Sequence, residues 1–278
     1  MAQNKLPVSD ECPTATEMPM LGLGTWKNSD PAACAESVAT ALETGYRHID
    51  TGQVYNNEAA VGNGIEQAAV DREEAFLATK IWIDNLAYDD VLETADASLD
   101  RLGVDSVDLL YVHWPSRTYD AEETLAAFNE LHEQGKIDRI GVSNFEPAQL
   151  AEAIELSDAP IFANQIEIHP LLQQEELREV CADHEIELVA YSPLARGGVF
   201  DVPEITSIAD DHGVSPAQIS LAWLRHHGIT AIPKATGAEH IRDNWASLSV
   251  SLSDAEIETI DSIETTDRRV DPDFGPWN

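Results

Sequence analysis

Four polar side chains stand where short apolar segments of the sequence end: Asp50, Tyr55, Lys80 and His113. Each has an ordinary interpretation when taken singly. An aspartate there often forms a turn or caps a helix, a lysine extends from a strand end to water, and a buried histidine is hydrogen-bonded within the core. All four at strand ends instead predict one shared site.

Proton donation to an oxygen atom is the chemistry that this quartet predicts. A tyrosine hydroxyl has a pKa near ~10, and a nearby ammonium favours the phenolate. We therefore expect Lys80 to lower the pKa of Tyr55, Asp50 to keep Lys80 charged, and His113 to orient a substrate carbonyl. The sequence has no zinc-ligand pattern and no nucleophile paired with a base, so a hydride from a bound cofactor is the expected attacking group.

A (β/α)8 barrel would bring these residues together, because its active site lies at the carboxyl ends of its strands. Eight near-continuously apolar segments, each followed by a helical pattern, predict an α/β barrel forming a single domain over residues 1–278. The alternative is an open doubly wound sheet, but Gly22-Leu23-Gly24 lacks the third glycine of the phosphate-binding turn. The expected strands are 20–25, 48–51, 75–81, 107–114, 137–144, 161–168, 186–192 and 230–235; the expected helices are 31–44, 57–69, 88–102, 121–134, 147–156, 175–184, 204–211 with 215–226, 239–246 and 254–263.

Charge is the compositional anomaly. The 51 acidic and 16 basic residues give a net charge of −35, spread over the whole chain. Phosphates would be repelled, which argues against a nucleic-acid partner and against an anionic membrane surface. This dispersed charge predicts a protein of an extreme halophile, in which molar salt screens the repulsion. In an acidic mesophilic protein, the alternative, the same charge would be strongly destabilising.

The cysteines and the lengths of the apolar runs predict the cellular compartment of the protein. Cys12, Cys34 and Cys181 are odd in number and lack metal-ligand spacing, which predicts free thiols in a reducing compartment. No apolar run approaches the ~18 residues of a spanning helix, and residues 1–10 lack the regions of a signal peptide. We expect a cytoplasmic monomer that binds no metal.

Seven motifs of the chain resemble those of the aldo-keto reductase family, from about Met20 to the C terminus. The short loops 116–121 and 195–203, with Asp271-Pro272-Asp273-Phe274, are similar to the bacterial 2,5-diketo-D-gluconate and glyoxal reductases of that family. The motifs are Gly45-Tyr46-Arg47-His48-Ile49-Asp50-Thr51 with Tyr55 and Asn57-Glu58, Thr79-Lys80-Ile81-Trp82, Asp108 to Pro115, Gly141-Val142-Ser143-Asn144-Phe145, Asn164-Gln165-Ile166-Glu167, Tyr191-Ser192-Pro193-Leu194 and Ile232-Pro233-Lys234.

The resemblance implies a barrel that binds NADPH without a Rossmann fold. Tyr55 would be the general acid, completed by Asp50, Lys80 and His113. The carboxamide would be held by Ser143, Asn144 and Gln165, the nicotinamide ring would stack on Tyr191, and the pyrophosphate would follow Ser192, Leu194, Arg196, Gly197 and Gly198. Further cofactor contacts implied are Gly24, Thr25, Trp26, Asp50, Ile232, Lys234, Ala235, Thr236, His240 and Asn244; the implied substrate contacts are Trp26, Trp82, His113 and Trp114.

Two departures from the family pattern fall at the adenosine end. Ala235 and His240 stand where a serine and an arginine commonly hold the 2′-phosphate, leaving Lys234, Thr236 and Arg242 as contacts. NADPH is still expected, with weakened discrimination against NADH. The expected substrates are small aldehydes, ketones, dicarbonyls and sugars, with Trp277 closing the pocket. The alternatives are a nicotinamide-binding regulatory subunit, or the same site oxidising alcohols.

Overall fold

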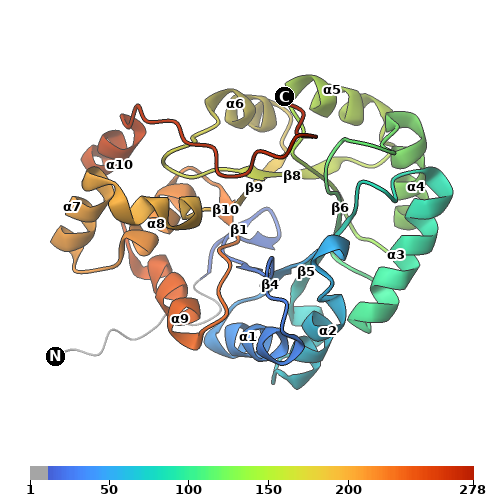
Figure 1. Ribbon diagram of the computed structural model, residues 1–278, viewed down its shortest axis with the longest axis horizontal. Helices are drawn as coiled ribbons and strands as arrows, with labels where there is room; N and C mark the ends of the chain where they lie inside the picture. The colour runs from blue at the N-terminus through green and yellow to red at the C-terminus, as the bar shows by residue number, and fades with distance from the viewer. Residues whose placement is uncertain (1–11) are drawn as a thin grey trace.

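The structure, a computed structural model, describes residues 12–278, so the prediction about a signal peptide in residues 1–10 lies outside it. Eight parallel strands form one sheet in which each strand pairs with the next along the chain. The sheet lies inside a ring of helices (Figure 1), so the predicted (β/α)8 barrel is confirmed. The strands are β3 (Leu23–Gly24), β4 (His48–Asp50), β5 (Phe76–Ile81), β6 (Leu109–Val112), β7 (Ile140–Ser143), β8 (Ile161–Glu167), β9 (Glu187–Tyr191) and β10 (Thr230–Ala231).

The helices follow the predicted order closely. Those at 31–44, 88–102 and 147–156 have the predicted bounds. Local signals explain why several begin where they do. The Asp30 side chain accepts a hydrogen bond from the first turn of one helix, and Ser253 with Glu256 forms a capping box on another. The helices are α1 (Pro31–Thr44), α2 (Glu58–Gln67), α3 (Tyr88–Leu102), α4 (Ala121–Glu133), α5 (Pro147–Leu156), α6 (Glu175–Asp183), α7 (Pro203–His212), α8 (Pro216–His226), α9 (Ala238–Ala246) and α10 (Asp254–Asp261).

The barrel closes between its first and last strands, which are shorter than predicted. Parallel bridges join Leu21 to Ala231 and Gly24 to Lys234. A Cβ atom at Gly24 would lie 2.6 Å from the carbonyl oxygen of Ile232, so only glycine allows this approach. The strands expected at 20–25 and 230–235 shrink to two residues each, although isolated bridges show that the two segments stay paired beyond them.

A short antiparallel hairpin, β1 (Thr14–Ala15) with β2 (Met18–Pro19), lies across the barrel axis in Figure 1 and was not predicted. Met18 is fully buried and packs with the side chains that fill the barrel, among them Tyr111 and Val189. The hairpin therefore closes the barrel at the end opposite the strand carboxyl termini. Two-residue strands give no periodic pattern by which to recognise them.

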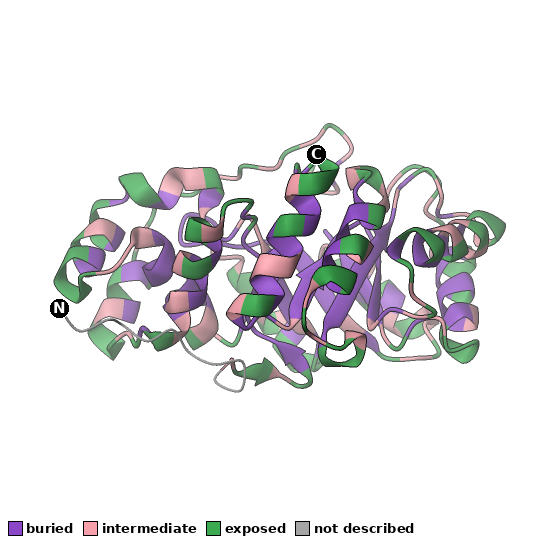
Figure 2. Ribbon diagram, turned by 90° about the horizontal axis from the view of Figure 1, so that it is seen from below, coloured by how far each residue is buried: buried purple, intermediate pink, exposed green. Residues whose placement is uncertain are grey.

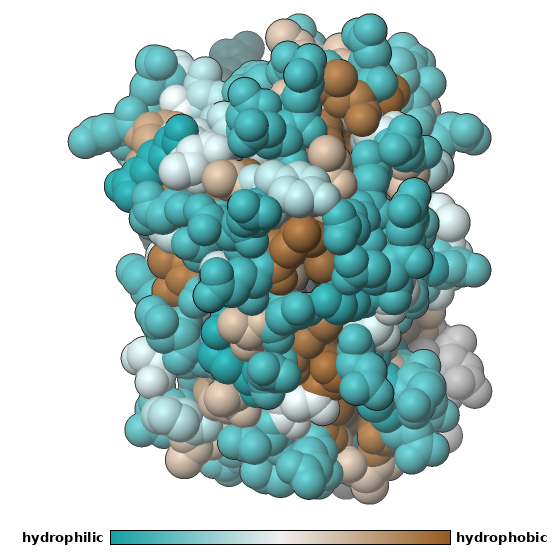
Figure 3. Space-filling model, turned by 90° about the vertical axis from the view of Figure 1, so that its right-hand side faces the viewer, coloured by the Kyte–Doolittle hydropathy of each residue, from teal (hydrophilic) through white to brown (hydrophobic). Residues whose placement is uncertain are grey.

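The outer surface carries the acidic excess. Figure 2 shows buried residues on the strands and on the inward sides of the helices, with exposed residues facing out. The face over α3 and α4 is largely hydrophilic (Figure 3). No helix within residues 12–278 is both long enough and apolar enough to cross a membrane. The exposed acidic residues of α3 and α4 are Asp89, Asp90, Glu93, Asp96, Asp100, Glu122, Glu123 and Glu133.

Candidate active site

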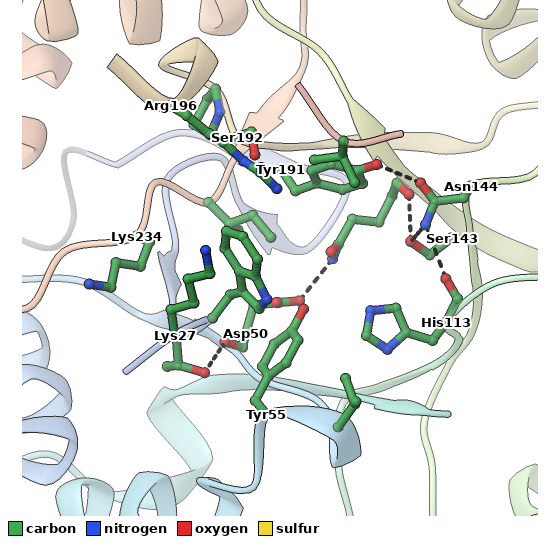
Figure 4. Close-up of a pocket in the computed structure, with 18 of the residues that line it drawn as sticks. Lys27, Asp50, Tyr55, His113, Ser143, Asn144, Tyr191, Ser192, Arg196 and Lys234 are labelled. Atoms are coloured by element: carbon green, nitrogen blue, oxygen red, sulfur yellow. Dashed lines mark hydrogen bonds between the residues drawn. The ribbon is translucent and has the colours of Figure 1, made fainter. Parts of the chain in front are cut away.

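A pocket of about 680 Å³ opens at the carboxyl ends of the strands, where Asp50, Ser143 and Tyr191 end their strands. Figure 4 shows Tyr55 and His113 facing the same space as these side chains. The pocket is lined by all of the predicted substrate contacts and by all of the predicted cofactor contacts except Gly198 and, at the adenosine end, Ala235, Thr236, His240, Arg242 and Asn244.

Asp50 and Lys80 form a buried ion pair beneath the pocket. The side chain of Lys80 is fully buried and that of Asp50 is 2% exposed. The ammonium also donates to the Thr51 carbonyl at 2.7 Å, and Gln165 Nε2 donates to the second Asp50 oxygen at 2.8 Å. Burial lowers the pKa of Lys80, while attraction to Asp50 acts in the opposite direction. These two hydrogen bonds and the ion pair itself fix the positions of both side chains.

Tyr55 ends a short 3₁₀ helix, η2 (Gln53–Tyr55), that follows β4. The ammonium of Lys80 lies 5.2 Å from its ring centroid. The expectation that Lys80 lowers the pKa of Tyr55 is nevertheless not met. Burial raises that pKa well above its ordinary value, and the charges of Asp50 and Tyr191 add to the effect. The hydroxyl therefore stays protonated at neutral pH.

His113 stands edge-on to Tyr55, with ring centroids 5.6 Å apart, and to Trp82 at 5.1 Å. Burial lowers the pKa of His113 well below its ordinary value, and the charge of Lys80 lowers it further. The imidazole is therefore neutral at pH 7. Its buried Nδ1 atom has no hydrogen-bond partner within residues 12–278. Several other buried polar atoms of the described residues also lack a partner, but this one belongs to a side chain that lines the pocket.

A hydrogen-bonded group from β7, β8 and β9 forms the floor beside the ion pair. Asn144 has a left-handed backbone with φ of 63°, and its Nδ2 donates to the His113 carbonyl at 3.1 Å. Ser143 Oγ donates to the Gln165 carbonyl at 2.7 Å, and Tyr191 OH donates to Asn144 Oδ1 at 2.7 Å. These bonds fix the amide and hydroxyl groups as well as the ring of Tyr191.

Three cations lie together on one side of the pocket, away from His113 (Figure 4). They are Lys27, Arg196 and Lys234. Lys27 and Arg196 both lie over the ring of Trp26, at 4.4 and 4.7 Å from its centroid. None of the three forms an ion pair with a carboxylate of the described residues, and Asp50 is the one acidic residue that lines the pocket. Lys27 was not among the predicted contacts.

Of the predicted adenosine-end residues, Lys234 lines the pocket, and the others lie outside its lining, on α9 and in the loop before it. Lys234 Nζ donates to Thr236 Oγ1 at 2.7 Å, which orients the lysine. Ala235 is buried and Asn244 is 4% exposed, so their side chains pack inward. His240 and Arg242 are exposed.

The segment 262–278, called the C-terminal tail below, forms the remaining wall. Val270, Pro272 and Phe274 line the pocket, and none of them was predicted as a contact. Phe274 lies edge-on to Trp114, with centroids 5.4 Å apart. Trp277, which was expected to close the pocket, instead packs behind Trp114 at 5.5 Å and does not line it. The aromatic residues were visible in the sequence, but the path of the tail was not.

No group of three or more histidine, cysteine or acidic side chains within residues 12–278 is placed to hold a metal ion. The three cysteines are free thiols, and Cys34 and Cys181 are buried. Burial raises the pKa of Cys34 to about 11, which leaves it an unreactive thiol at neutral pH.

Comparison with known proteins agrees with this geometry. Residues 20–265 match the model of the Aldo/keto reductase family. The chain belongs to the aldo/keto reductase family. This aldo/keto reductase is 39% identical to the glyoxal reductase of Bacillus subtilis over 256 residues, 92% of either chain. It superimposes on the structure of a putative 2,5-diketo-D-gluconic acid reductase B with a TM-score of 0.89 and 35% identity, over 97% of this chain and 95% of the other.

A further relative is the aldo-keto reductase of Bombyx mori, whose structure was solved in complex with NADP. Its TM-score is 0.86 and its identity 33%, over 91% of this chain and 92% of the other. Together with the family match, these relatives establish the chain as an oxidoreductase.

Proposed function

We propose that the protein reduces small aldehydes, ketones and dicarbonyls with NADPH, and that Tyr55 is the general acid. The observation that carries the proposal is the pocket in which Tyr55, His113 and Asp50 meet above the buried ammonium of Lys80, beside three cations without acidic partners. In this mechanism Tyr55 donates its proton to the carbonyl oxygen. The ammonium of Lys80, 5.2 Å from the ring centroid, is the cation placed to offset part of the cost of burying the phenolate that remains, and neutral His113 holds the same oxygen by a hydrogen bond.

The residues present fit a nicotinamide dinucleotide, which would supply the hydride. Lys27, Arg196 and Lys234 are the groups suited to its phosphates, because an unpaired cation in so acidic a protein favours an anionic ligand. The amides of Asn144 and Gln165 suit a carboxamide, and the ring of Tyr191 offers a flat apolar face. The relative from Bombyx mori solved with NADP supports the same assignment.

The preference for NADPH rests on Lys234, oriented by Thr236. Ala235 offers no donor, and exposed His240 lacks the bidentate fork of an arginine. We expect kcat/KM to favour NADPH over NADH by a modest factor of about ten, to be measured with one aldehyde at saturation. Equal values for the two coenzymes would leave the lysine without a role in phosphate selection.

The substrate half of the pocket is lined by the apolar, mostly aromatic side chains of Trp82, Trp114, Val270 and Phe274. Such a surface suits uncharged carbonyl compounds with small or aromatic substituents, because a carboxylate would lose its water without gaining a partner. The relative from Bacillus subtilis is a glyoxal reductase by name, and glyoxal belongs to this class.

The test is Tyr55→Phe, assayed with NADPH and methylglyoxal or an aromatic aldehyde. We expect kcat to fall by about 10²- to 10⁴-fold, while NADPH binding, followed by fluorescence titration, stays unchanged. Tyr88→Phe is the matched control, since that hydroxyl lies on α3 and bonds Glu130 away from the pocket. Near-normal turnover in Tyr55→Phe would refute the assigned role.

We propose further that the protein works in molar salt, as a halophile's protein would. Its 51 acidic residues exceed its 16 basic residues by 35, so most carboxylates have no cation of their own. At ~1 M salt the Debye length is about 3 Å, and repulsion between surface carboxylates is then largely screened. Loss of structure on dilution of potassium chloride supports this proposal.

A further inference from the structure

The C-terminal tail, residues 262–278, forms part of the pocket without having any helix or strand of its own. It leaves α10 and crosses the carboxyl ends of β9 and β8 toward α5 (Figure 1). Its last residues bond one another, as from Gly275 N to the Pro272 carbonyl at 2.8 Å, but a segment outside helices and sheets keeps its position only if other parts of the chain bind its backbone. The shape of the substrate half therefore depends on whatever holds this segment.

Glu167, the last residue of β8, binds the tail backbone. Its side chain is fully buried. Oε1 accepts a hydrogen bond from the backbone nitrogen of Arg269 at 2.8 Å, and Oε2 accepts one from that of Val270 at 2.9 Å. His169 Nε2 lies 2.9 Å from Oε1. No lysine or arginine pairs with Glu167 in the described part of the chain.

This arrangement joins the barrel directly to the pocket wall. The two donors lie about a hundred residues from Glu167 in sequence, and the second donor, Val270, itself lines the pocket. Hydrogen bonds from backbone N–H groups to a buried carboxylate are stronger than neutral ones. The tail has one other backbone bond to this region, from Asp267 N to the Leu171 carbonyl at 2.7 Å.

The tail then carries its aromatic residues onto the substrate half. Phe274 contacts both Trp82 and Trp114 edge-on, with centroids 6.1 and 5.4 Å apart. The indole of Trp277 donates to Asp271 at 2.8 Å and is covered by Arg268, whose guanidinium carbon lies 3.8 Å from a ring centroid. A shift of the backbone at 269–270 would move this group as a unit.

We propose that Glu167 is a positioning residue that anchors the C-terminal tail and thereby sets the substrate half of the pocket. Its side chain does not line the pocket, so we expect its loss to act through the tail, on substrate affinity and not on cofactor affinity. The anchoring stands on the structure alone; the effect on substrate rests on the proposed function.

The experiment compares Glu167→Gln with wild type by hydrogen exchange and by kinetics. Glutamine keeps the size of the side chain but replaces one acceptor oxygen by an N–H group facing a backbone donor. We expect the amides of residues 269 and 270 to exchange at least about tenfold faster. The KM for an aromatic aldehyde rises about tenfold, while kcat and the Kd for NADPH stay within about twofold.

Glu187→Gln is the matched control for the charge change. Glu187 begins the neighbouring strand β9 at the opposite end of the barrel, where it bonds Thr16. It should leave both tail exchange and KM unchanged. If tail exchange in Glu167→Gln equals that of the wild type, the anchor is refuted whatever the kinetics show.

A double-variant cycle separates positioning from general destabilisation. Phe274→Ala removes the aromatic wall, so adding Glu167→Gln should raise KM little further. Fully additive effects would overturn the positioning role. If wild type reduces no aldehyde, the proposed function fails, yet the exchange measurement still decides the anchor.

A second pair of variants acts from the tail side, should Glu167→Gln not fold. Val270→Pro removes the N–H that Oε2 accepts, and Val270→Ala keeps that N–H while shortening the side chain. Faster exchange at residue 269 in the proline variant alone supports the anchor. Equal exchange in both variants contradicts it.

Discussion

Replacing Asp50 by asparagine leaves the ammonium of Lys80 buried without its ion-pair partner. Both side chains are almost completely inaccessible, and the oxygen atoms left beside the ammonium are uncharged: the Thr51 carbonyl at 2.7 Å and the side-chain amide of the new asparagine. Removing one partner of a buried pair costs about 3–5 kcal/mol, because the other charge stays desolvated. At about 2–4 °C per kcal/mol for a domain of this size class, the midpoint of thermal unfolding should fall by roughly 10 °C.

The pH dependence of this loss has a definite sign. Burial already lowers the pKa of Lys80, and without Asp50 the largest opposing attraction is gone, leaving only that of Glu58. A lysine whose folded pKa lies below its unfolded value of ~10.4 loses stability as the pH falls through the interval between them, at up to about 1.4 kcal/mol per unit. The penalty of Asp50→Asn should therefore be larger at pH 7 than at pH 10.

Urea unfolding followed by circular dichroism, in molar potassium chloride, measures both effects. The double variant Asp50→Asn with Lys80→Met removes the stranded charge and should recover most of the lost free energy of unfolding. Two results would refute the reasoning: an Asp50→Asn variant within about 1 kcal/mol of wild type at pH 7, or a double variant no more stable than Asp50→Asn alone.

Three further predictions concern pH, packing and salt. The acid limb of a kcat/KM profile should begin well below pH 6.5 and the alkaline limb above pH 10, because the pKa of His113 is lowered and that of Tyr55 raised; a limb near pH 7 would contradict these assignments. Gly45→Ala should cost about 1–3 kcal/mol by urea unfolding, since φ is 130° and a Cβ would lie 2.6 Å from the ring of Trp245; an unchanged stability would mean that the turn relaxes freely. Diluting potassium chloride from ~1 M to below ~0.1 M should lower the thermal midpoint, and a midpoint independent of salt would remove the halophile interpretation.

The position of the polar quartet could be predicted because it depends on strand ends. Asp50, Lys80 and His113 each follow an apolar segment whose length and composition define a strand, and parallel strands end at one rim. Tyr55 lies five residues after Asp50, within reach of that rim. The local pattern was enough to predict that these residues meet, because the barrel topology brings all strand ends to the same rim.

The environment of these residues could not be predicted in the same way. An ammonium was expected to dominate the pKa of Tyr55, yet burial dominates, and burial depends on every element packed around the ring. The path of the tail could not be predicted either. Val270 and Phe274 belong to a segment without hydrophobic periodicity. The carboxylate that binds the tail backbone is that of Glu167, about a hundred residues away in sequence. Such long-range contacts leave no local signature.

Because the hairpin of β1 and β2 covers one end of the barrel, the pocket and the closing hairpin lie at opposite ends. Met18 secures one end, while the side chains suited to chemistry gather at the other. Substitutions in the loops and the tail can therefore change which substrates bind. The closed end is untouched by them and continues to contribute the folding stability that such substitutions reduce.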